Sequence, residues 1–149
     1  MDNQIILKEV SIDEAFKVHV QIPEFKNDLK YTKEYSQEHC KGKDTLIIVA
    51  YLHNSPIGYL VAYDKFDDGS FYCWMTGVLP DYRKRGVFKA MMSYLEEIAK
   101  QKGYFTIKIK TRNNRREMLA YLIKHGFYFT EVIPFPNIED NRIVLEKRI

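Results

Sequence analysis

The sequence predicts one α/β domain that spans residues 1–149. A chain of 149 residues can bury a substantial core and is too short for two ordinary domains. Strand-like and helix-like segments follow one another along the whole chain, and 46% hydrophobic with 29% charged residues is the composition of a folded globular protein. These observations favour a central sheet covered by helices.

The N-terminal part of the sequence predicts one strand and two helices. Residues 4–10 form a short strand, and Ser11 is placed to cap a helix that starts directly after it. A second, polar helix is expected over residues 29–40, with Tyr31 and Tyr35 on one side. That side is suited to cover a pocket.

Three strands and a long helix are predicted next. Two apolar strands, residues 45–52 and 57–66, are joined by a turn, and a third strand, residues 71–79, stops at a proline. From Phe88 onward apolar residues recur with helical spacing, which predicts a helix over residues 85–102 that a glycine ends.

The C-terminal part predicts strand, helix and two further strands. Residues 104–112 alternate apolar and basic side chains, which is typical of a half-buried strand. Asn114 is then placed to cap a helix that ends at a His-Gly pair. Residues 127–135 and 141–149 form the last strands, with two prolines in the loop between them.

Charge is distributed unevenly along the chain. The net charge is only +3, but residues 83–149 carry 15 Lys and Arg against 7 Asp and Glu, which leaves 8 against 13 for residues 1–82. The two parts therefore carry about +8 and −5. This asymmetry indicates that the C-terminal part binds a polyanion, although a solvated basic surface would have the same composition.

The stretch DYRKRGVFKAMM, residues 81–92, has the features of a phosphate site. It joins a strand to a helix, and a helix start attracts anions through unpaired N–H groups and the helix dipole. Gly86 has no Cβ and lets a phosphate approach the backbone. The cations of this stretch are Arg83, Lys84, Arg85 and Lys89.

Two motifs resemble the GNAT superfamily of acyl-CoA N-acyltransferases. VLPDYRKRGVF is similar to its cofactor-binding signature, with Phe88 where the family has Gly or Ala. IKIKTRNNRREMLAYLIKHGF is similar to its second half, a basic strand followed by a helix that ends in Gly-Phe. The order of elements agrees over nearly the whole chain.

The resemblance implies a fold and a cofactor site. It implies a mixed, mostly antiparallel sheet of about seven strands, flanked by about four helices and splayed open between the fourth and fifth strands. The pantetheine arm of acetyl-CoA would lie in that gap and pair with backbone groups near Gly77. A strand-end bulge is the alternative explanation of this glycine. The implied cofactor-binding residues are Gly77, Val78, Arg83, Lys84, Arg85, Gly86, Val87, Phe88, Lys89 and Asn114.

The catalytic residues are less well specified by the sequence. Members of the family often have a tyrosine as general acid four residues before the glycine of Gly-Phe, and here Leu122 occupies that position. Tyr121, one residue earlier and rotated by about 100° on a helix, is the candidate general acid. The candidates for a general base are Cys73, Tyr72, Asp64 and Glu117, beside a water-mediated route. No metal site is expected.

We therefore expect an N-acetyltransferase that moves an acetyl group from acetyl-CoA to a primary amine of a small molecule or peptide. The acceptor pocket is expected between the N-terminal helices and the loop 134–137, lined by Tyr31, Tyr35 and Phe135. A non-catalytic acyl-CoA-binding domain and a basic nucleic-acid-binding domain are the alternatives; the modest net charge disfavours nucleic acid as partner. No membrane span or leader is apparent, and the cytoplasm is the expected location. The oligomeric state, including a homodimer, stays open.

Overall fold

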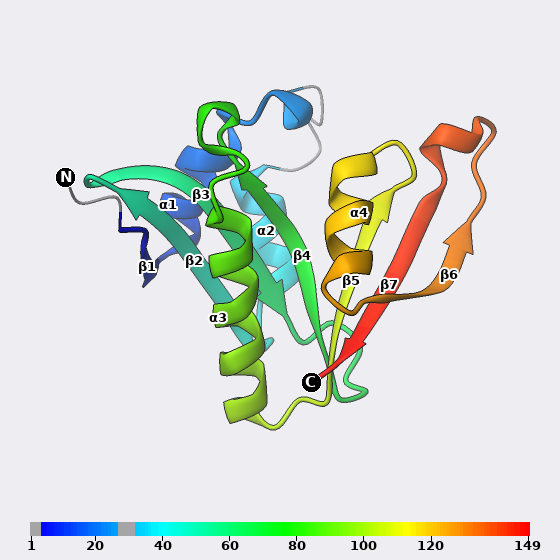
Figure 1. The fold of residues 1–149 in the computed structure, drawn as a ribbon. Coiled ribbons are helices and arrows are strands. Elements are labelled where there is room, and N and C mark those ends of the chain that lie inside the picture. The colour runs from blue at the N-terminus through cyan, green and yellow to red at the C-terminus, as the bar shows by residue number, and fades with distance from the viewer. Residues whose placement is uncertain (1–3, 27–31) are drawn as a thin grey trace.

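The fold is a single α/β domain built on one seven-stranded sheet (Figure 1). The computed structural model describes residues 4–26 and 32–149. Along the sheet the strands follow the order β1-β2-β3-β4-β5-β7-β6, and all neighbours are antiparallel except β4 and β5, which are parallel. The expected mixed, mostly antiparallel sheet is thus confirmed.

The strands are β1 (Ile6–Glu9), β2 (Thr45–Leu52), β3 (Ser55–Tyr63), β4 (Ser70–Val78), β5 (Thr106–Arg112), β6 (Tyr128–Ile133) and β7 (Arg142–Arg148). The α-helices are α1 (Ile12–His19), α2 (Lys33–Cys40), α3 (Val87–Lys102) and α4 (Arg116–Lys124). Three short 3-10 helices are η1 (Pro23–Phe25), η2 (Pro80–Tyr82) and η3 (Ile138–Asp140).

Helices cover both faces of the sheet (Figure 1). The apolar sides of α3 and α4 pack on one face, where Met91, Leu95 and Leu122 are fully buried against β2 to β5 and β7. α1 packs on the other face, where Val18 contributes to a smaller core over β2 to β4. The burial of these apolar stripes is the main force that holds the helices to the sheet.

The sheet opens between β4 and β5. These strands pair only from Ser70 with Thr106 to Cys73 with Ile109. Beyond this last pair β5 continues along β7, whereas β4 continues along β3, so the two strands diverge (Figure 1). We call the Cys73–Ile109 pair the vertex of the fork.

A β-bulge in β4 lies next to the vertex. Val61 of β3 faces Met75, but Ala62 faces Cys73, which leaves Trp74 as the extra residue on β4. A bulge interrupts the alternation of side chains. As a result, Trp74 and Met75 both pack on the α1 side, while Cys73 belongs to the core under α3. Gly77, for which the sequence left a strand-end bulge open, is regularly paired with Tyr59.

Local signals locate most of the predicted elements. Ser11 caps α1 by accepting a hydrogen bond from the backbone N–H of Glu14, as expected. Gly103 ends α3 in a left-handed conformation. The second helix begins only at Lys33, after Thr32 as N-cap, and its predicted start at residues 29–31 lies outside the described residues.

The predicted capping role of Asn114 is wrong. Arg115 is the N-cap of α4, and no side chain caps the helix. The neighbouring Asn113 is held instead, because its N–H donates to the carbonyl of Asn141 and its side chain donates to the carbonyl of Ile138. These two bonds tie Asn113 to the η3 segment. They hold the chain in a conformation in which Arg115, and not Asn114, occupies the N-cap position.

Within residues 4–26 and 32–149, no helix is long and apolar enough to span a membrane.

Candidate active site

A large cleft of about 910 Å³ follows the gap between β4 and β5. Its lining comes from the diverging part of β4, the turn before α3, the end of β5 and one side of α4, together with side chains of α1, α2 and η1. From the vertex to Val78, five residues of β4 span about 17 Å. The cleft is therefore long and has two distinct ends, which we call the cradle end and the aromatic end.

The cradle end is the turn of residues 83–86 and the start of α3. Gly86 has φ +84° and is the N-cap of α3, and a Cβ at this position would meet no atom within 4 Å. The glycine is thus required by its backbone conformation, and space remains for a ligand above the helix start. Lys84 also has a positive φ, of 62°, although it is not glycine. Such strain is typical of turns that hold a ligand.

Two carboxylates oppose the cations of the cradle. The Arg83 guanidinium donates from Nε to the carbonyl of Val78 and forms a 2.9 Å ion pair with Glu24. The hydrogen bond that the Arg83 guanidinium donates to the Glu24 carboxylate lowers the pKa of Glu24, whereas burial raises it. Lys84 Nζ lies 3.7 Å from Glu117 of α4 in an exposed pair. Two of the four cations predicted to bind phosphate, Arg83 and Lys84, are therefore already paired with a carboxylate.

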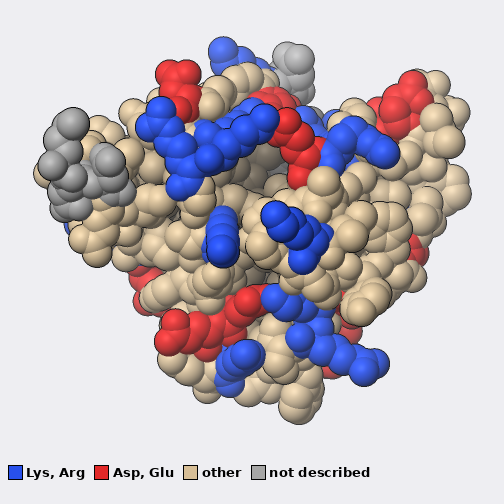
Figure 2. Space-filling view, viewed as in Figure 1, with Lys and Arg blue, Asp and Glu red and all other residues tan. Residues whose placement is uncertain are grey.

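Figure 2 shows Lys and Arg side chains around the hollow near the start of α3, with acidic side chains beside them. The cations that line the cleft at this end are Arg83, Lys84, Lys89, Arg115 and Arg116, whereas Arg85 lies 5.5 Å from the Tyr82 ring and is not among the lining residues. Asn114 also lines the cleft here. The five cations outnumber the two carboxylates at this end, and an excess of positive charge at a helix start favours an anionic group such as a phosphate.

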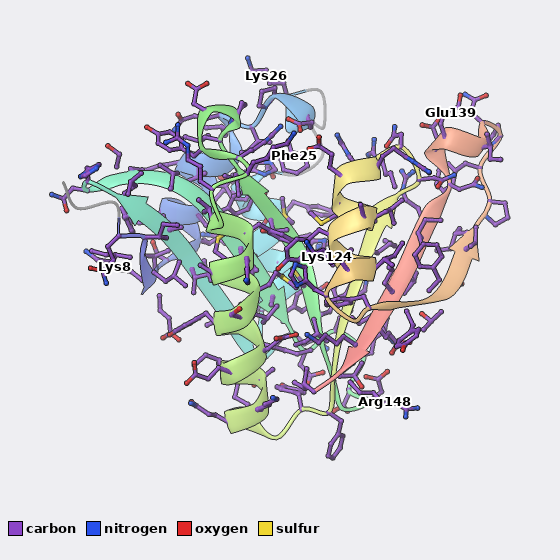
Figure 3. The ribbon with its side chains drawn as sticks, viewed as in Figure 1. Lys8, Phe25, Lys26, Lys124, Glu139 and Arg148 are labelled. Atoms are coloured by element: carbon purple, nitrogen blue, oxygen red, sulfur yellow. The ribbon has the colours of Figure 1, made fainter. Side chains whose placement is uncertain are left out.

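Gly77 is needed for packing. A Cβ on this residue would lie 3.2 Å from Ile22 and 3.3 Å from the Phe25 ring. Figure 3 shows Phe25 extending from η1 toward the end of β4. The absence of a Cβ at Gly77 lets both side chains pack over the strand. Beyond the vertex, the edge of β4 that faces β5 does not pair with β5.

Phe88 and Tyr121 form the wall between α3 and α4. Val87, not Phe88, is the fully buried residue at the start of α3. The Phe88 ring is half-buried, lines the cleft and meets the Tyr121 ring edge-on at 4.8 Å. Leu122, at the position of the family's usual acid, is 0% exposed in the core. Tyr121 is therefore the tyrosine of α4 that lines the cleft, and burial, followed by the charge of Glu96, raises its pKa.

The candidate bases differ in their access to the cleft. Burial raises the pKa of the Cys73 thiol to about 12, so this group stays neutral. Asp64 accepts hydrogen bonds from Tyr104 and from the backbone of Asp67 and does not line the cleft. Tyr72 and Glu117 do line it, at opposite ends.

The aromatic end lies beside the vertex, on the face of α1 and α2. His39 of α2 stacks on the Trp74 indole at 5.1 Å, and Tyr35 lies 4.1 Å from the His39 ring. His39 Nδ1 is 3.2 Å from the backbone carbonyl of Tyr35. A carbonyl only accepts, so Nδ1 carries the hydrogen and Nε2 has the lone pair in the neutral ring. The residues of this end are Tyr35, His39, Lys65, Tyr72, Trp74 and Lys110.

Sequence reasoning only partly located this end. Tyr35 lines the cleft as expected, whereas Tyr31 lies outside the described residues. Phe135 does not line the cleft, because its ring packs against Arg142 at 4.2 Å. Trp74, for which the sequence pattern gave no functional signal, is a wall of the cleft because of the bulge.

Solved structures of other proteins share this fold. The chain resembles ribosomal-protein-S18-alanine N-acetyltransferase from Escherichia coli, with a TM-score of 0.80 and 12% identity over 98% of this chain and 94% of the other. It also resembles a GNAT family acetyltransferase from Elizabethkingia anophelis with acetyl-CoA bound (0.77, 18%, 100% of both chains) and an IAA acetyltransferase from Bacillus cereus (0.79, 15%, 98% and 100%). These likenesses show an acetyltransferase fold. No curated protein matches the chain by sequence.

The chain belongs to the acetyltransferase (GNAT) family, whose family model matches residues 12–127. The donor in this family is acetyl-CoA, and its members act on amines of small molecules or peptides.

Proposed function

We propose that this protein is an acetyl-CoA-dependent N-acetyltransferase that acetylates a primary amine. The observation that carries the proposal is the gap between β4 and β5, which connects a basic helix start with an aromatic pocket. In a member of the acetyltransferase family, this continuous cleft fits a cofactor with phosphates at one end and a reactive thioester at the other.

The donor would lie along the diverging part of β4. Its phosphates would meet the backbone N–H groups after Gly86 and the cations Lys84 and Lys89. Its pantetheine amides would pair with the backbone edge of β4 near Gly77 and Val78, in the manner of an added strand. Arg83 holds the carbonyl of Val78 and the carboxylate of Glu24, so its contribution is to fix the turn that carries the cradle.

The transfer forms a C–N bond and breaks the C–S bond of the thioester. The neutral amine attacks the carbonyl carbon, the nitrogen then loses a proton, and the departing thiolate gains one. Tyr121 is our candidate to donate that proton, because it lines the cleft and its raised pKa keeps the phenol protonated near neutral pH.

The amine must lose a proton before it attacks. A lysine-like amine with a pKa near 10.4 costs about 4–5 kcal/mol to deprotonate at neutral pH. His39 is our candidate base, since it lines the aromatic end and its Nε2 has the lone pair in the neutral ring. The imidazole can accept the proton directly or through one water.

The first experiment is a calorimetric titration of the full chain with acetyl-CoA, CoA and, as a polyanion control, single-stranded DNA at physiological salt. Micromolar acetyl-CoA binding without comparable DNA binding is the expected result. Release of CoA in the presence of a panel of primary amines then tests turnover. DNA binding without acetyl-CoA binding would overturn the proposal, and acetyl-CoA binding without turnover on any amine would favour a non-catalytic acyl-CoA-binding domain.

Three further expectations accompany this function. We propose that residues 1–149 act as one acyltransferase domain and that the protein works in the cytoplasm, where its two cysteine side chains would stay reduced. A homodimer is compatible with the exposed edge strand β6, and sedimentation would determine the oligomeric state.

A further inference from the structure

The charges along the cleft are sorted by position. Among the described residues that line it, the carboxylates are Glu24 and Glu117, and both belong to the cradle end. Each is paired there with a cation, Arg83 or Lys84. The face toward α1 and α2 carries cations instead. They are Lys65, which follows β3, Lys110 and Arg112 of β5, and Arg142 of β7.

Lys65 and Lys110 lie next to the vertex and act on each other. The ammonium group of Lys65 rests on the Tyr72 ring at 5.1 Å and on the Phe66 ring at 5.5 Å. Burial, followed by the charge of Lys110, lowers the pKa of Lys65. Among the described residues, no carboxylate forms an ion pair with either lysine. Two ammonium groups that repel each other in one cleft are stabilised when an anion lies between them.

The neighbouring Lys108 provides an internal comparison. It lies on the same strand and covers the Phe66 ring at 4.2 Å, but its Nζ is paired with Asp68 at 3.5 Å and Glu146 at 3.8 Å. On this face, Lys108 is thus paired with two carboxylates, whereas Lys65 and Lys110, the two lysines of this face that line the cleft, have no carboxylate partner among the described residues.

The phosphates of the donor cannot supply the missing anion. The cradle starts beyond Val78, about 17 Å along β4 from the vertex. With the phosphates at the cradle, the thioester end of the donor lies toward the vertex, where the acceptor must meet it. An anion between Lys65 and Lys110 therefore belongs to the acceptor.

We infer that the acceptor amine carries an anionic group, a carboxylate or a phosphate, which binds between Lys65 and Lys110 while the body of the acceptor packs on Trp74 and His39. This inference rests on the proposed function and specifies the substrate class of the same cleft. A charged hydrogen bond from each ammonium group would fix the acceptor, and the stacked rings offer an apolar wall beside it.

Trp74 is the only tryptophan of the chain, so its fluorescence reports on this end of the cleft directly. The protein, saturated with CoA, is titrated with matched probes: phenylalanine against phenylalaninamide for the carboxylate, and O-phosphoethanolamine against ethanolamine for the phosphate. We expect at least one anionic probe to bind about tenfold more tightly than the partner that lacks the anionic group. The pair that shows the preference identifies the anion.

Lys65→Met keeps the apolar stem and removes the charge, and it should abolish the preference. Lys108→Met is the matched control and should retain it, with thermal unfolding to verify that both variants are folded. Equal affinity for both members of each pair, or a preference that survives Lys65→Met, would overturn the inference. Failure of the proposed function would be distinguishable, because the protein would then not bind acetyl-CoA or would release no CoA with any amine of the panel.

Discussion

The two ends of the cleft are built in different ways. The centre of the cradle end is one run of consecutive residues, 83–89, and the groups that we propose to bind an anion there are backbone N–H groups at a helix start. The aromatic end consists of side chains from α2, β4, β5 and the segment after β3, which are far apart in the sequence. In the function that we propose, local backbone geometry binds the donor, whereas side chains that the fold brings together select the acceptor.

The largest loss of activity is expected at Tyr121, between the two ends of the cleft. Tyr121→Phe removes the proposed proton donor, and kcat should fall about hundredfold while acetyl-CoA affinity stays unchanged. Burial raises the pKa of this phenol above the ordinary tyrosine pKa of about 10. The phenol therefore stays protonated up to at least that pH, and the alkaline loss of activity should begin only above it. Tyr128→Phe, on a tyrosine that is 77% exposed on β6, is the control. Wild-type turnover in Tyr121→Phe would remove the assignment.

Gly86→Glu tests the cradle end alone. The new side chain has room, but it strains a backbone with φ +84° and brings a carboxylate to the proposed phosphate site. Acetyl-CoA affinity should fall at least tenfold, or about 1.4 kcal/mol, in calorimetry.

Gly42→Glu is its matched control. Gly42 also has a positive φ, of 72°, and open space, but it does not line the cleft. Both variants should lose similar thermal stability, and only Gly86→Glu should lose affinity. An equal loss of affinity in both would mean that the cradle is not the phosphate site.

His39→Gln tests the aromatic end alone. At neutral pH kcat/KM should fall about tenfold, because the amine loses its proposed base. The difference in kcat/KM between His39→Gln and the wild type should become smaller as the pH approaches the pKa of the amine, since a neutral amine needs no base. His53→Asn, in the hairpin turn with φ 51°, is a control whose backbone conformation asparagine tolerates. A defect that is independent of pH would indicate that His39 only packs against Trp74.

The smallest predicted change in acetyl-CoA affinity concerns the exposed ion pair between Lys84 and Glu117 at the cradle end. Glu117→Gln releases Lys84, and acetyl-CoA should bind about twofold more tightly, because both side chains are exposed and such pairs are weak. The gain should vanish at about 1 M salt. Glu97→Gln, exposed on α3, is the control. Weaker binding in Glu117→Gln would mean that this carboxylate supports the cradle.

The same contrast explains what the sequence could predict. Gly86 and its cations stand in one short stretch, so helix-start physics and a family resemblance were enough to predict a turn at Gly86 followed by a helix. The phosphate-binding role of this turn stays a prediction. The aromatic end has no such signature, because Lys65, His39 and Trp74 come together only through the bulge and the packing of α2. The capping role of Asn114 was wrong for a related reason, since the contacts of Asn113 with a distant segment decided where α4 begins.

The short seam between β4 and β5 has a consequence for solubility. Four residue pairs join the two halves of the sheet, and beyond them the facing edges of β4 and β5 do not pair with each other. Edges of this kind recruit extended segments of other chains and start aggregation. A bound donor would occupy the opening and shield both edges. The ligand would then act as a protective strand, and the empty protein should form aggregates at a lower temperature than the protein with acetyl-CoA.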